Sequence, residues 1–256
     1  MARSISFDKV AAIYDATRGG LERGVRFAAA LAPRCGPGPI FEIGIGTGAI
    51  ALPLGDALGR AVLGADLSPA MLLQAQERLG ARVAVADVGV LPLSMGSVGT
   101  IVASWVLHLV GDPAATLREC RRVLRADGRL LVISSNADFE PDEIGAAFAG
   151  PDGTPIDFTE LLRGRADVSE RLIPMAEAAG FALVEESFTA RDEWHESPTD
   201  VVERMAKRQW GVLIDLDQAR FDEHVQPVID RLCELPEPDR ARVRASRNHL
   251  SVFATR

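Results

Sequence analysis

Short apolar runs alternate with amphipathic segments along the first 135 residues. These runs have the length of β-strands and lie at 39–43, 61–66, 83–87, 100–104 and 130–134. In the segments between them, apolar residues recur every three or four positions, as in Met71, Leu72, Ala75 and Leu79. That spacing is the period of a helix. Continuous apolar strands alternating with helices predict an α/β protein whose parallel sheet is buried on both faces.

The second half of the chain is less regular. A helix is expected at 170–179 and a strand at 181–189, and the chain finishes on an apolar strand at 250–254. A long polar segment of helical character, about 191–246, separates these last two strands. We therefore expect one domain over residues 1–256, in which the segment 191–246 forms a helical cap over the ligand-binding edge of the sheet.

A glycine-rich loop follows the first expected strand. Residues 41–48 read Phe-Glu-Ile-Gly-Ile-Gly-Thr-Gly. Glycines so closely spaced let a ligand approach the backbone, and a helix that starts near Ala49 would point its first amides into the same loop. Ligands of open parallel sheets bind outside the carboxyl ends of the strands. The polar residues at the ends of the first four strands should therefore line one crevice, and they are Glu42, Asp66, Asp87 and Ser104.

Two kinds of ligand suit such a crevice. A dinucleotide needs G-x-G-x-x-G/A with an acid about 20 residues further on, a pattern that can be laid over Gly44, Gly46, Ala49 and Asp66. However, Glu42 would lie close to the pyrophosphate and repel it. The dinucleotide also leaves Gly48 and Asp87 unexplained. A carboxylate beside the loop better suits a cationic ligand.

The ordered set of motifs at 41–48, 66–71, 86–87 and 104–110 resembles the class I S-adenosylmethionine-dependent methyltransferases. It is most similar to the branch that acts on small molecules and includes the ubiquinone and menaquinone biosynthesis enzymes. The resemblance covers about residues 7–135. It implies a Rossmann-like, doubly wound, mostly parallel seven-stranded sheet with a helical cap, with S-adenosylmethionine as cofactor and S-adenosylhomocysteine as product. One departure is Gly99-Thr100, where the family often has Phe-Asp.

The resemblance also assigns cofactor-binding roles. The loop glycines would wrap the methionine part and the ribose, while Glu42 would order the loop and favour the positive charge of the ligand. Asp66 would accept hydrogen bonds from the ribose hydroxyls, and Asp87 with the amide of Val88 would bind the adenine edge. The loop glycines of this assignment are Gly44, Gly46 and Gly48. Leu67 and Met71 would pack against the adenine ring, and Ser104 and Trp105, at and after the end of the fourth strand, would complete the cofactor contacts. For both aspartates, a helix cap or a loop turn is the alternative.

The first 30 residues resemble the helical lead-in of the same family. Val10, Ile13 and Tyr14 share one helical face. By the resemblance, Tyr14 and Arg18 close over the ligand, and the arginine meets its carboxylate. Plain core packing for Tyr14 and a solvated position for Arg18 are the alternatives.

Methyl transfer is a direct displacement at an activated sulfonium, which requires alignment and, for some acceptors, proton removal. His108 follows the fourth strand and is the candidate base, since imidazole exchanges protons near neutral pH. A histidine that only packs or hydrogen-bonds in the pocket is the alternative. The expected cap offers substrate walls at Trp194, His195, Arg208 and Trp210, although tryptophans there also fit the core of the cap.

Composition limits the partners. The 256 residues carry a formal net charge of −8, which disfavours broad electrostatic capture of nucleic acid or anionic membrane. No stretch approaches the ~20 apolar residues that a membrane helix needs, and the first residues do not read as a signal peptide. The three cysteines form no metal-ligand pattern. We expect a cytoplasmic protein that acts on a small-molecule acceptor without nucleic acid, membrane or metal, and we leave a homodimer open.

Methyl transfer to O, N or C of a metabolite ranks first because the cofactor motifs are intact. A second interpretation is an enzyme of the same fold that uses bound S-adenosylmethionine for a cyclisation or decarboxylation. An NAD(P)-dependent oxidoreductase and a binding protein without turnover are further alternatives. Release of S-adenosylhomocysteine on turnover would separate the first two.

Overall fold

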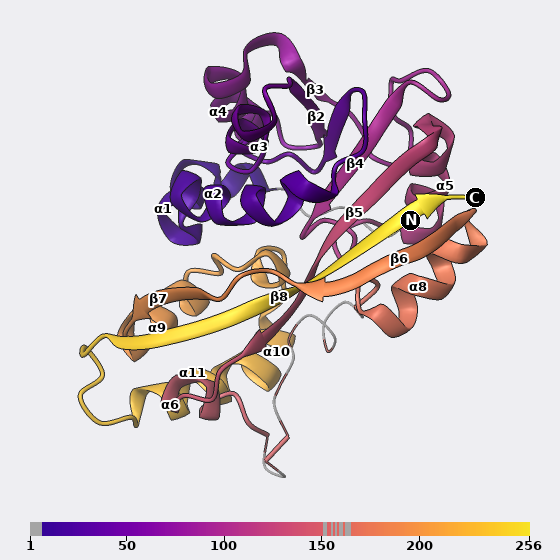
Figure 1. Ribbon diagram of the computed structural model, residues 1–256. Helices are drawn as coiled ribbons and strands as arrows, with labels where there is room; N and C mark the ends of the chain where they lie inside the picture. The colour runs from indigo at the N-terminus through magenta and orange to yellow at the C-terminus, as the bar shows by residue number, and fades with distance from the viewer. Residues whose placement is uncertain (1–6, 151–152, 155, 157, 159–160, 162–164) are drawn as a thin grey trace. The chain divides into compact units, whose positions relative to one another are not determined.

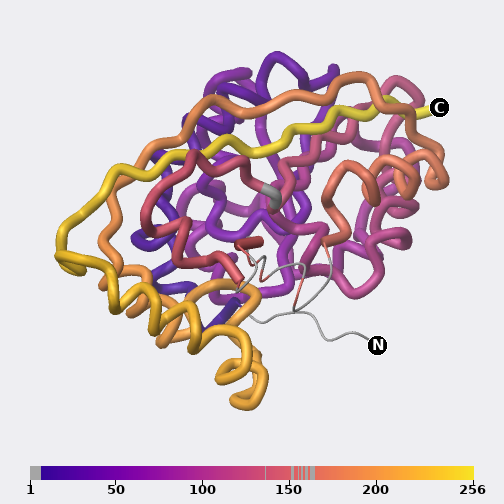
Figure 2. The backbone as a smooth tube through the Cα atoms, turned by 90° about the horizontal axis from the view of Figure 1, so that it is seen from below, coloured from indigo at the N-terminus to yellow at the C-terminus, as the bar shows by residue number. Residues whose placement is uncertain are grey.

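The computed structural model describes residues 7–150, 153–154, 156, 158, 161 and 165–256 (Figure 1). Residues 1–6 of the expected lead-in lie outside the described residues. The chain divides into two compact units. The first unit comprises 1–137, 165–190 and 248–256, and the second comprises 138–164 and 191–247. Figure 2 follows the backbone as it passes from the first unit to the second, back again, and once more through the second unit before it ends in the first.

The strands join in the order β3-β2-β1-β4-β5-β8-β6, and β7 pairs with β8. Pairing is parallel between β1 and β2, β1 and β4, β2 and β3, and β4 and β5, whereas β8 runs antiparallel to β6 and β7. The expected mostly parallel α/β fold is therefore confirmed. The strands are β1 (Ile40–Ile43), β2 (Val62–Asp66), β3 (Val83–Val85), β4 (Val98–Ser104), β5 (Leu124–Phe139), β6 (Phe181–Phe188), β7 (Asp192–Glu196) and β8 (Arg242–Thr255).

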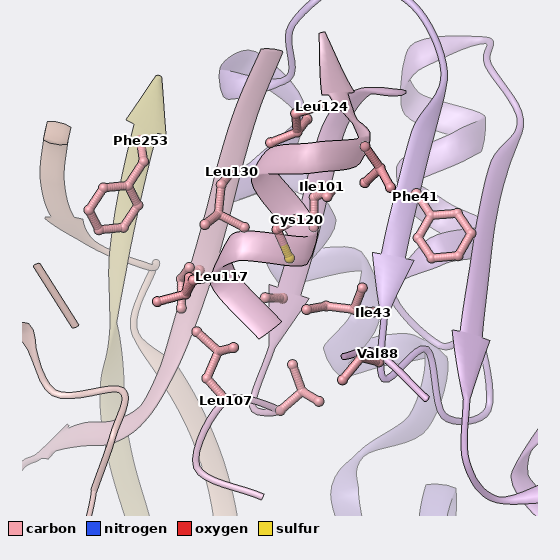
Figure 3. Close-up of a cluster of buried hydrophobic side chains, with 14 of the residues drawn as sticks. Phe41, Ile43, Val88, Ile101, Leu107, Leu117, Cys120, Leu124, Leu130 and Phe253 are labelled. Atoms are coloured by element: carbon pink, nitrogen blue, oxygen red, sulfur yellow. The ribbon is translucent and has the colours of Figure 1, made fainter. Parts of the chain in front are cut away.

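Helices pack on both faces of the sheet in the first unit. Side chains alternate along each strand, so Phe41 and Ile43 of β1 enter one buried cluster with α5 and α8. Figure 3 shows part of this cluster, with Leu117 and Cys120 of α5 facing the strands. Ile40 enters the other cluster with α2, α3 and α4. The helices and 3₁₀ turns of this unit are η1 (Phe7–Lys9), α1 (Ala11–Arg18), α2 (Gly20–Leu31), η2 (Ala32–Arg34), α3 (Ala51–Leu58), α4 (Pro69–Leu79), η3 (Gly80–Arg82), α5 (Pro113–Val123) and α8 (Ser169–Ala178).

The second unit has its own apolar core. Buried side chains from α6, α9 and α11 form it, together with Phe221 and Val225 of the π-helical turn η5. No described helix is both long and apolar enough to cross a membrane. The helical elements of this unit are α6 (Glu143–Ala146), α9 (Pro198–Ala206), η4 (Gly211–Leu213), α10 (Gln218–Arg220), η5 (Phe221–Val225) and α11 (Gln226–Cys233).

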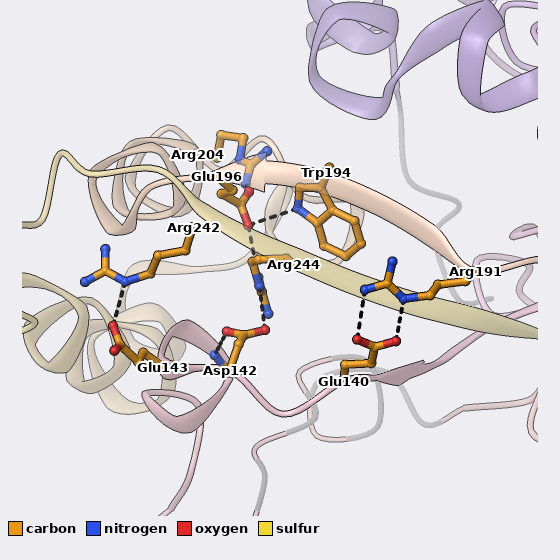
Figure 4. A network of polar contacts seen from close by, with 10 residues as sticks. Glu140, Asp142, Glu143, Arg191, Trp194, Glu196, Arg204, Arg242 and Arg244 are labelled. Atoms are coloured by element: carbon orange, nitrogen blue, oxygen red, sulfur yellow. Dashed lines mark hydrogen bonds and ion pairs between the residues drawn. The ribbon is translucent and has the colours of Figure 1, made fainter.

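Buried charges tie β7 and β8 to α6 in the second unit (Figure 4). Arg244 donates to Asp142 Oδ2 over 3.0 Å and to Glu196 Oε2 over 2.9 Å, and Arg204 also pairs with Glu196. The guanidinium of Arg244 lies 5.6 Å from the ring centres of both Phe139 and Trp194. Each buried charge has an opposite partner, which burial of ions requires.

Three expectations about segments were wrong. The segment 191–246 is not wholly helical, because it begins with β7 and ends inside β8. The last strand starts at Arg242 rather than at residue 250, because Arg242 and Arg244 point inward on β8 and find carboxylates there, while Val243 is half-exposed. The strand expected at 83–87 ends at Val85, since Asp87 turns the chain by accepting from the Gly89 amide over 2.8 Å.

Candidate active site

The glycine loop lies where β1 ends and adopts a conformation that favours glycine. Gly44, Gly46 and Gly48 have φ of 65°, 55° and 75°, in the left-handed region where a side chain is strained. A Cβ on Gly44 would also come within 2.5 Å of Val106 Cγ2. A Cβ on Gly46 would meet no heavy atom within 4 Å, so the middle of the loop borders open space. The loop backbone is therefore curved and accessible at its centre.

Glu42 is a buried acid beneath this loop. Its side chain is 2% exposed, and burial raises its pKa to about 8, with Asp66 adding to the rise and Ser104 opposing it. Among the described residues, neither Glu42 Oε2 nor Ser104 Oγ has a hydrogen-bond partner. Buried polar atoms without partners are rare and costly, so both suit a ligand group at the carboxyl edge of β1 and β4.

Asp66, at the end of β2, hydrogen-bonds to the backbone of the glycine loop. Its Oδ2 accepts from the Gly46 amide over 2.9 Å, and its Oδ1 accepts from the Ser68 amide over 2.9 Å. Burial raises the pKa of this carboxyl, although these backbone hydrogen bonds oppose the rise. Each oxygen keeps a further lone pair. Asp66 can therefore both fix the loop and accept hydroxyl groups from a ligand.

The expected adenine-binding residues lie beyond the ends of β2 and β3. Leu67 is 43% exposed, whereas Met71 and Val88 are buried. Asp87 is exposed and closes the turn at Gly89. The turn that the sequence left as an alternative for Asp87 is thus present, and its adenine contact stays a prediction.

Two acids that no sequence motif marks, Asp8 and Asp15, connect the N-terminal helical segment to the glycine loop and to α4. Asp15 of α1 accepts from Thr47 Oγ1 over 2.7 Å and pairs with Arg78 of α4. Arg78 also donates to the Thr47 carbonyl over 2.8 Å. Asp8 similarly accepts from Ser68 Oγ over 2.5 Å, at the start of α4. These contacts attach α1 and η1 directly to the loop and to α4.

Tyr14 and Arg18 lie on one face of α1 with a second arginine near them. Burial raises the pKa of the Tyr14 phenol, an effect that Arg18 and Arg23 oppose. Burial also lowers the pKa of Arg18, and the like charge of Arg23 adds to this. Arg23 lies over the ring of Trp105, with Cζ 4.5 Å from its centroid. Trp105 has φ of 51°, a strained value for its residue type. Two guanidinium groups beside the end of β4 favour an anionic ligand group.

His108 follows β4 and faces a buried carboxylate. Its Nδ1 lies 3.3 Å from Oδ2 of Asp167, an ion-pair distance without hydrogen-bond alignment. Asp167 was missed because it precedes α8 in a segment with no motif. His108 is thus brought to the carboxyl edge of the sheet together with the loop, as expected.

The four expected substrate residues all lie in the second unit, and three of them make side-chain contacts there. Trp194 donates to Glu196 over 3.4 Å, and Trp210 stacks on Phe148. Arg208 lies over the ring of Phe221 and donates to the Leu216 carbonyl. His195 is exposed on β7. Contact of these residues with an acceptor stays a prediction.

The arrangement in the first unit fits an adenosine-bearing, zwitterionic ligand. Backbone amides of a glycine loop, two acids and two arginines supply the donors and acceptors that such a ligand needs. Glu42 Oε2 and Ser104 Oγ, which have no hydrogen-bond partner among the described residues, add two polar atoms at the ends of β1 and β4. Among the described residues, no group of three or more His, Cys, Asp or Glu side chains could hold a metal.

Comparison with known proteins agrees with this chemistry. Residues 41–132 match the family model of the methyltransferase domain. The chain is 37% identical over 169 residues to malonyl-[acyl-carrier protein] O-methyltransferase of Laribacter hongkongensis, covering 58% of this chain and 54% of that protein. It is 32% identical over 151 residues to demethylmenaquinone methyltransferase of Thermus thermophilus, covering 55% and 67%.

A solved structure shares the fold. Phosphoethanolamine N-methyltransferase 2 of Haemonchus contortus superposes with a TM-score of 0.55 at 18% identity, over 97% of this chain and 57% of that one, and was solved with S-adenosylhomocysteine. The chain spans about half the length of the first curated relatives that it matches. The motifs, the fold and these relatives together establish that the chain belongs to the class I S-adenosylmethionine-dependent methyltransferases, whose cofactor is S-adenosylmethionine.

Proposed function

We propose that the protein transfers the methyl group of S-adenosylmethionine to a small-molecule acceptor. The observation that carries this proposal is the glycine loop, which is curved by three left-handed glycines, open at Gly46 and held by Asp66. The net charge of −8 supports a small acceptor rather than nucleic acid.

Different residues of the first unit would bind different parts of the cofactor. Gly44, Gly46 and Gly48 would carry the methionine part and the ribose, and Asp66 would accept the ribose hydroxyls. Arg18 would bind the carboxylate under Tyr14, while Glu42 and Ser104 would face the charged end. Leu67, Met71, Asp87 and Val88 would enclose adenine, and Trp105 would pack beside the ligand. The exposed fraction of Leu67, 43% in the free protein, supports its role as a surface that adenine covers.

The bound cofactor supplies an electrophilic methyl group on a sulfonium. The protein needs to orient the acceptor in line with that group and, where the acceptor carries an acidic proton, to remove it. His108 is the candidate base because it follows β4 beside Trp105. The relatives are named for acceptors as different as malonyl-[acyl-carrier protein] and demethylmenaquinone. These names support acceptor oxygen or carbon equally.

The proposal is tested by turnover with methyl-labelled S-adenosylmethionine. Two acceptor probes are used, malonyl N-acetylcysteamine thioester and 1,4-naphthohydroquinone, and both released S-adenosylhomocysteine and methylated product are measured. With either probe, equal amounts of S-adenosylhomocysteine and methylated product would support methyl transfer. Consumption of a probe without S-adenosylhomocysteine would favour non-methylating chemistry. Binding of NADH in preference to S-adenosylmethionine would contradict the cofactor assignment.

The ribose assignment gives a direct binding prediction. Replacing Asp66 with alanine removes a buried acceptor of ligand hydroxyls and frees the Gly46 amide, so S-adenosylhomocysteine should bind roughly 1–3 kcal/mol more weakly. Isothermal titration calorimetry measures this change. Asp56→Ala, an exposed aspartate on α3, is the control and should bind normally. Unchanged affinity in the Asp66 variant would overturn the ribose assignment.

A further inference from the structure

His108 and Asp167 form a buried acid–imidazole pair within the first unit. The His108 side chain is 10% exposed and the Asp167 side chain 1%, and Nδ1 lies 3.3 Å from Oδ2. An imidazole ring has two nitrogens, and the partner of one decides which of them carries the proton in the neutral form. A carboxylate facing Nδ1 favours the proton on Nδ1 and leaves the lone pair on Nε2.

Asp167 is itself held rigidly and as an anion. Ser135 of β5 donates its amide to Oδ2 over 2.5 Å and its hydroxyl to Oδ1 over 2.9 Å. Burial alone would raise the pKa of Asp167, but His108 and the Ser135 donors outweigh it and bring the pKa below its usual value. Both carboxylate oxygens thus have fixed donors, so the face that Asp167 presents to His108 is fixed too.

We propose that Asp167 is the positioning residue of a His108 general base, and that this base serves an acceptor whose reacting group is an O–H. This inference rests on the proposed methyl transfer. It assigns a role to Asp167 and Ser135, which no sequence motif marks. Ser135 fixes Asp167, Asp167 fixes the proton of His108 on Nδ1, and Nε2 is left to receive a proton.

The step balances without any further reactant. The acceptor O–H bond breaks, its proton passes to His108 Nε2, and its electron pair forms the new oxygen–carbon bond while the carbon–sulfur bond breaks. The imidazolium so formed lies beside the Asp167 carboxylate, which stabilises the positive charge. The proton then leaves to solvent, and the neutral Nδ1–H imidazole is restored.

The chemistry of the alternatives explains why an O–H group is favoured. A neutral amine attacks with its own lone pair, and a carboxylic acid is already ionised at neutral pH. Neither needs a base in the displacement. Phenols and alcohols hold their protons at neutral pH, so general base catalysis contributes to their methylation. Among oxygen and nitrogen acceptors, a buried carboxylate–imidazole pair is therefore of use mainly for hydroxyl groups.

Nitrogen-15 NMR of the histidine rings tests the positioning role without any acceptor. At a pH where the rings are neutral, His108 should show a protonated Nδ1 and an unprotonated Nε2, assigned by its loss in His108→Gln. In Asp167→Asn the tautomers should mix or reverse, while His195, His224 and His249 keep their shifts. Ser135→Ala, which keeps the carboxylate, should change the His108 signals less. An unchanged His108 tautomer in a folded Asp167→Asn protein would overturn the positioning role.

Turnover on two probes tests the acceptor class. The wild type should methylate 1,4-naphthohydroquinone on oxygen, which the methoxy group of the product shows. His108→Gln and Asp167→Asn should each lower that rate by about 10²-fold or more with S-adenosylhomocysteine affinity unchanged. Methylation of the malonyl thioester alone, methylation of a ring carbon of the hydroquinone, or equal rates in wild type and variants would overturn the O–H assignment. Absence of turnover on both probes would count against the proposed function, while the NMR result would still decide the role of Asp167.

Discussion

Replacing Glu42 with glutamine is expected to stabilise the cofactor-free protein at pH 8. Burial raises the pKa of Glu42 from 4.5 to about 8. Below pH 4.5 the carboxyl is protonated in both the folded and the unfolded protein, so its ionisation does not change the free energy of unfolding. Between pH 4.5 and 8 the unfolded chain loses this proton while the folded protein retains it, so the free energy of unfolding falls as the pH rises. The loss reaches on the order of 5 kcal/mol at pH 8, and glutamine, which has no proton to lose, avoids it.

Urea denaturation at pH 5 and pH 8 measures this effect. The Glu42→Gln protein should gain stability over wild type at pH 8 and much less at pH 5. Glu77→Gln on α4 changes an exposed carboxyl and should follow the wild-type pH dependence. The gain should come with weaker binding of S-adenosylmethionine, because glutamine cannot ionise beside the cationic ligand as the Glu42 carboxyl can. Such a loss of function often accompanies added stability at a ligand site. Parallel curves for Glu42→Gln and wild type would contradict the buried, protonated carboxyl.

The parallel part of the sheet follows from local sequence, whereas the second unit does not. Apolar runs such as 100–104 can only be strands buried on both sides, and β4 is buried throughout. By contrast, β8 begins with Arg242 and Arg244, whose inward orientation depends on carboxylates from α6 and β7. No local pattern indicates that an arginine will be buried, because its partners come from other parts of the chain.

The same distinction applies to the candidate site. The loop glycines and Asp66 could be predicted, because a curved loop and a strand-end acid are required by local geometry. Tyr14 and Arg18, four residues apart, could be placed on one helical face. Asp167 could not be predicted, because it acts only through its tertiary contact with His108. Its segment shows neither a motif nor a periodic pattern.

Replacing Gly24 with alanine is expected to destabilise the protein and weaken cofactor binding together. Alanine normally favours a helix over glycine by roughly 0.5–1 kcal/mol. Here α2 packs its backbone against the exit of the glycine loop, and a Cβ on Gly24 would overlap the Ala49 carbonyl, with its carbonyl carbon 2.7 Å away. Backbone cannot rotate aside as a side chain can. We therefore expect a loss of about 3 kcal/mol, at the upper end of overpacking costs.

The effect on binding distinguishes a strained helix from a displaced loop. Ala49 directly follows Gly48, so movement of its carbonyl displaces the amides that would hold the methionine part of the cofactor. Thermal melting and calorimetry with S-adenosylhomocysteine should both report a loss for Gly24→Ala. Gly145→Ala in α6 is the matched control, because a Cβ there makes only an ordinary contact, 3.6 Å from Asp142 Oδ1. Lower stability with full affinity would mean that α2 supports the fold without setting the position of the loop.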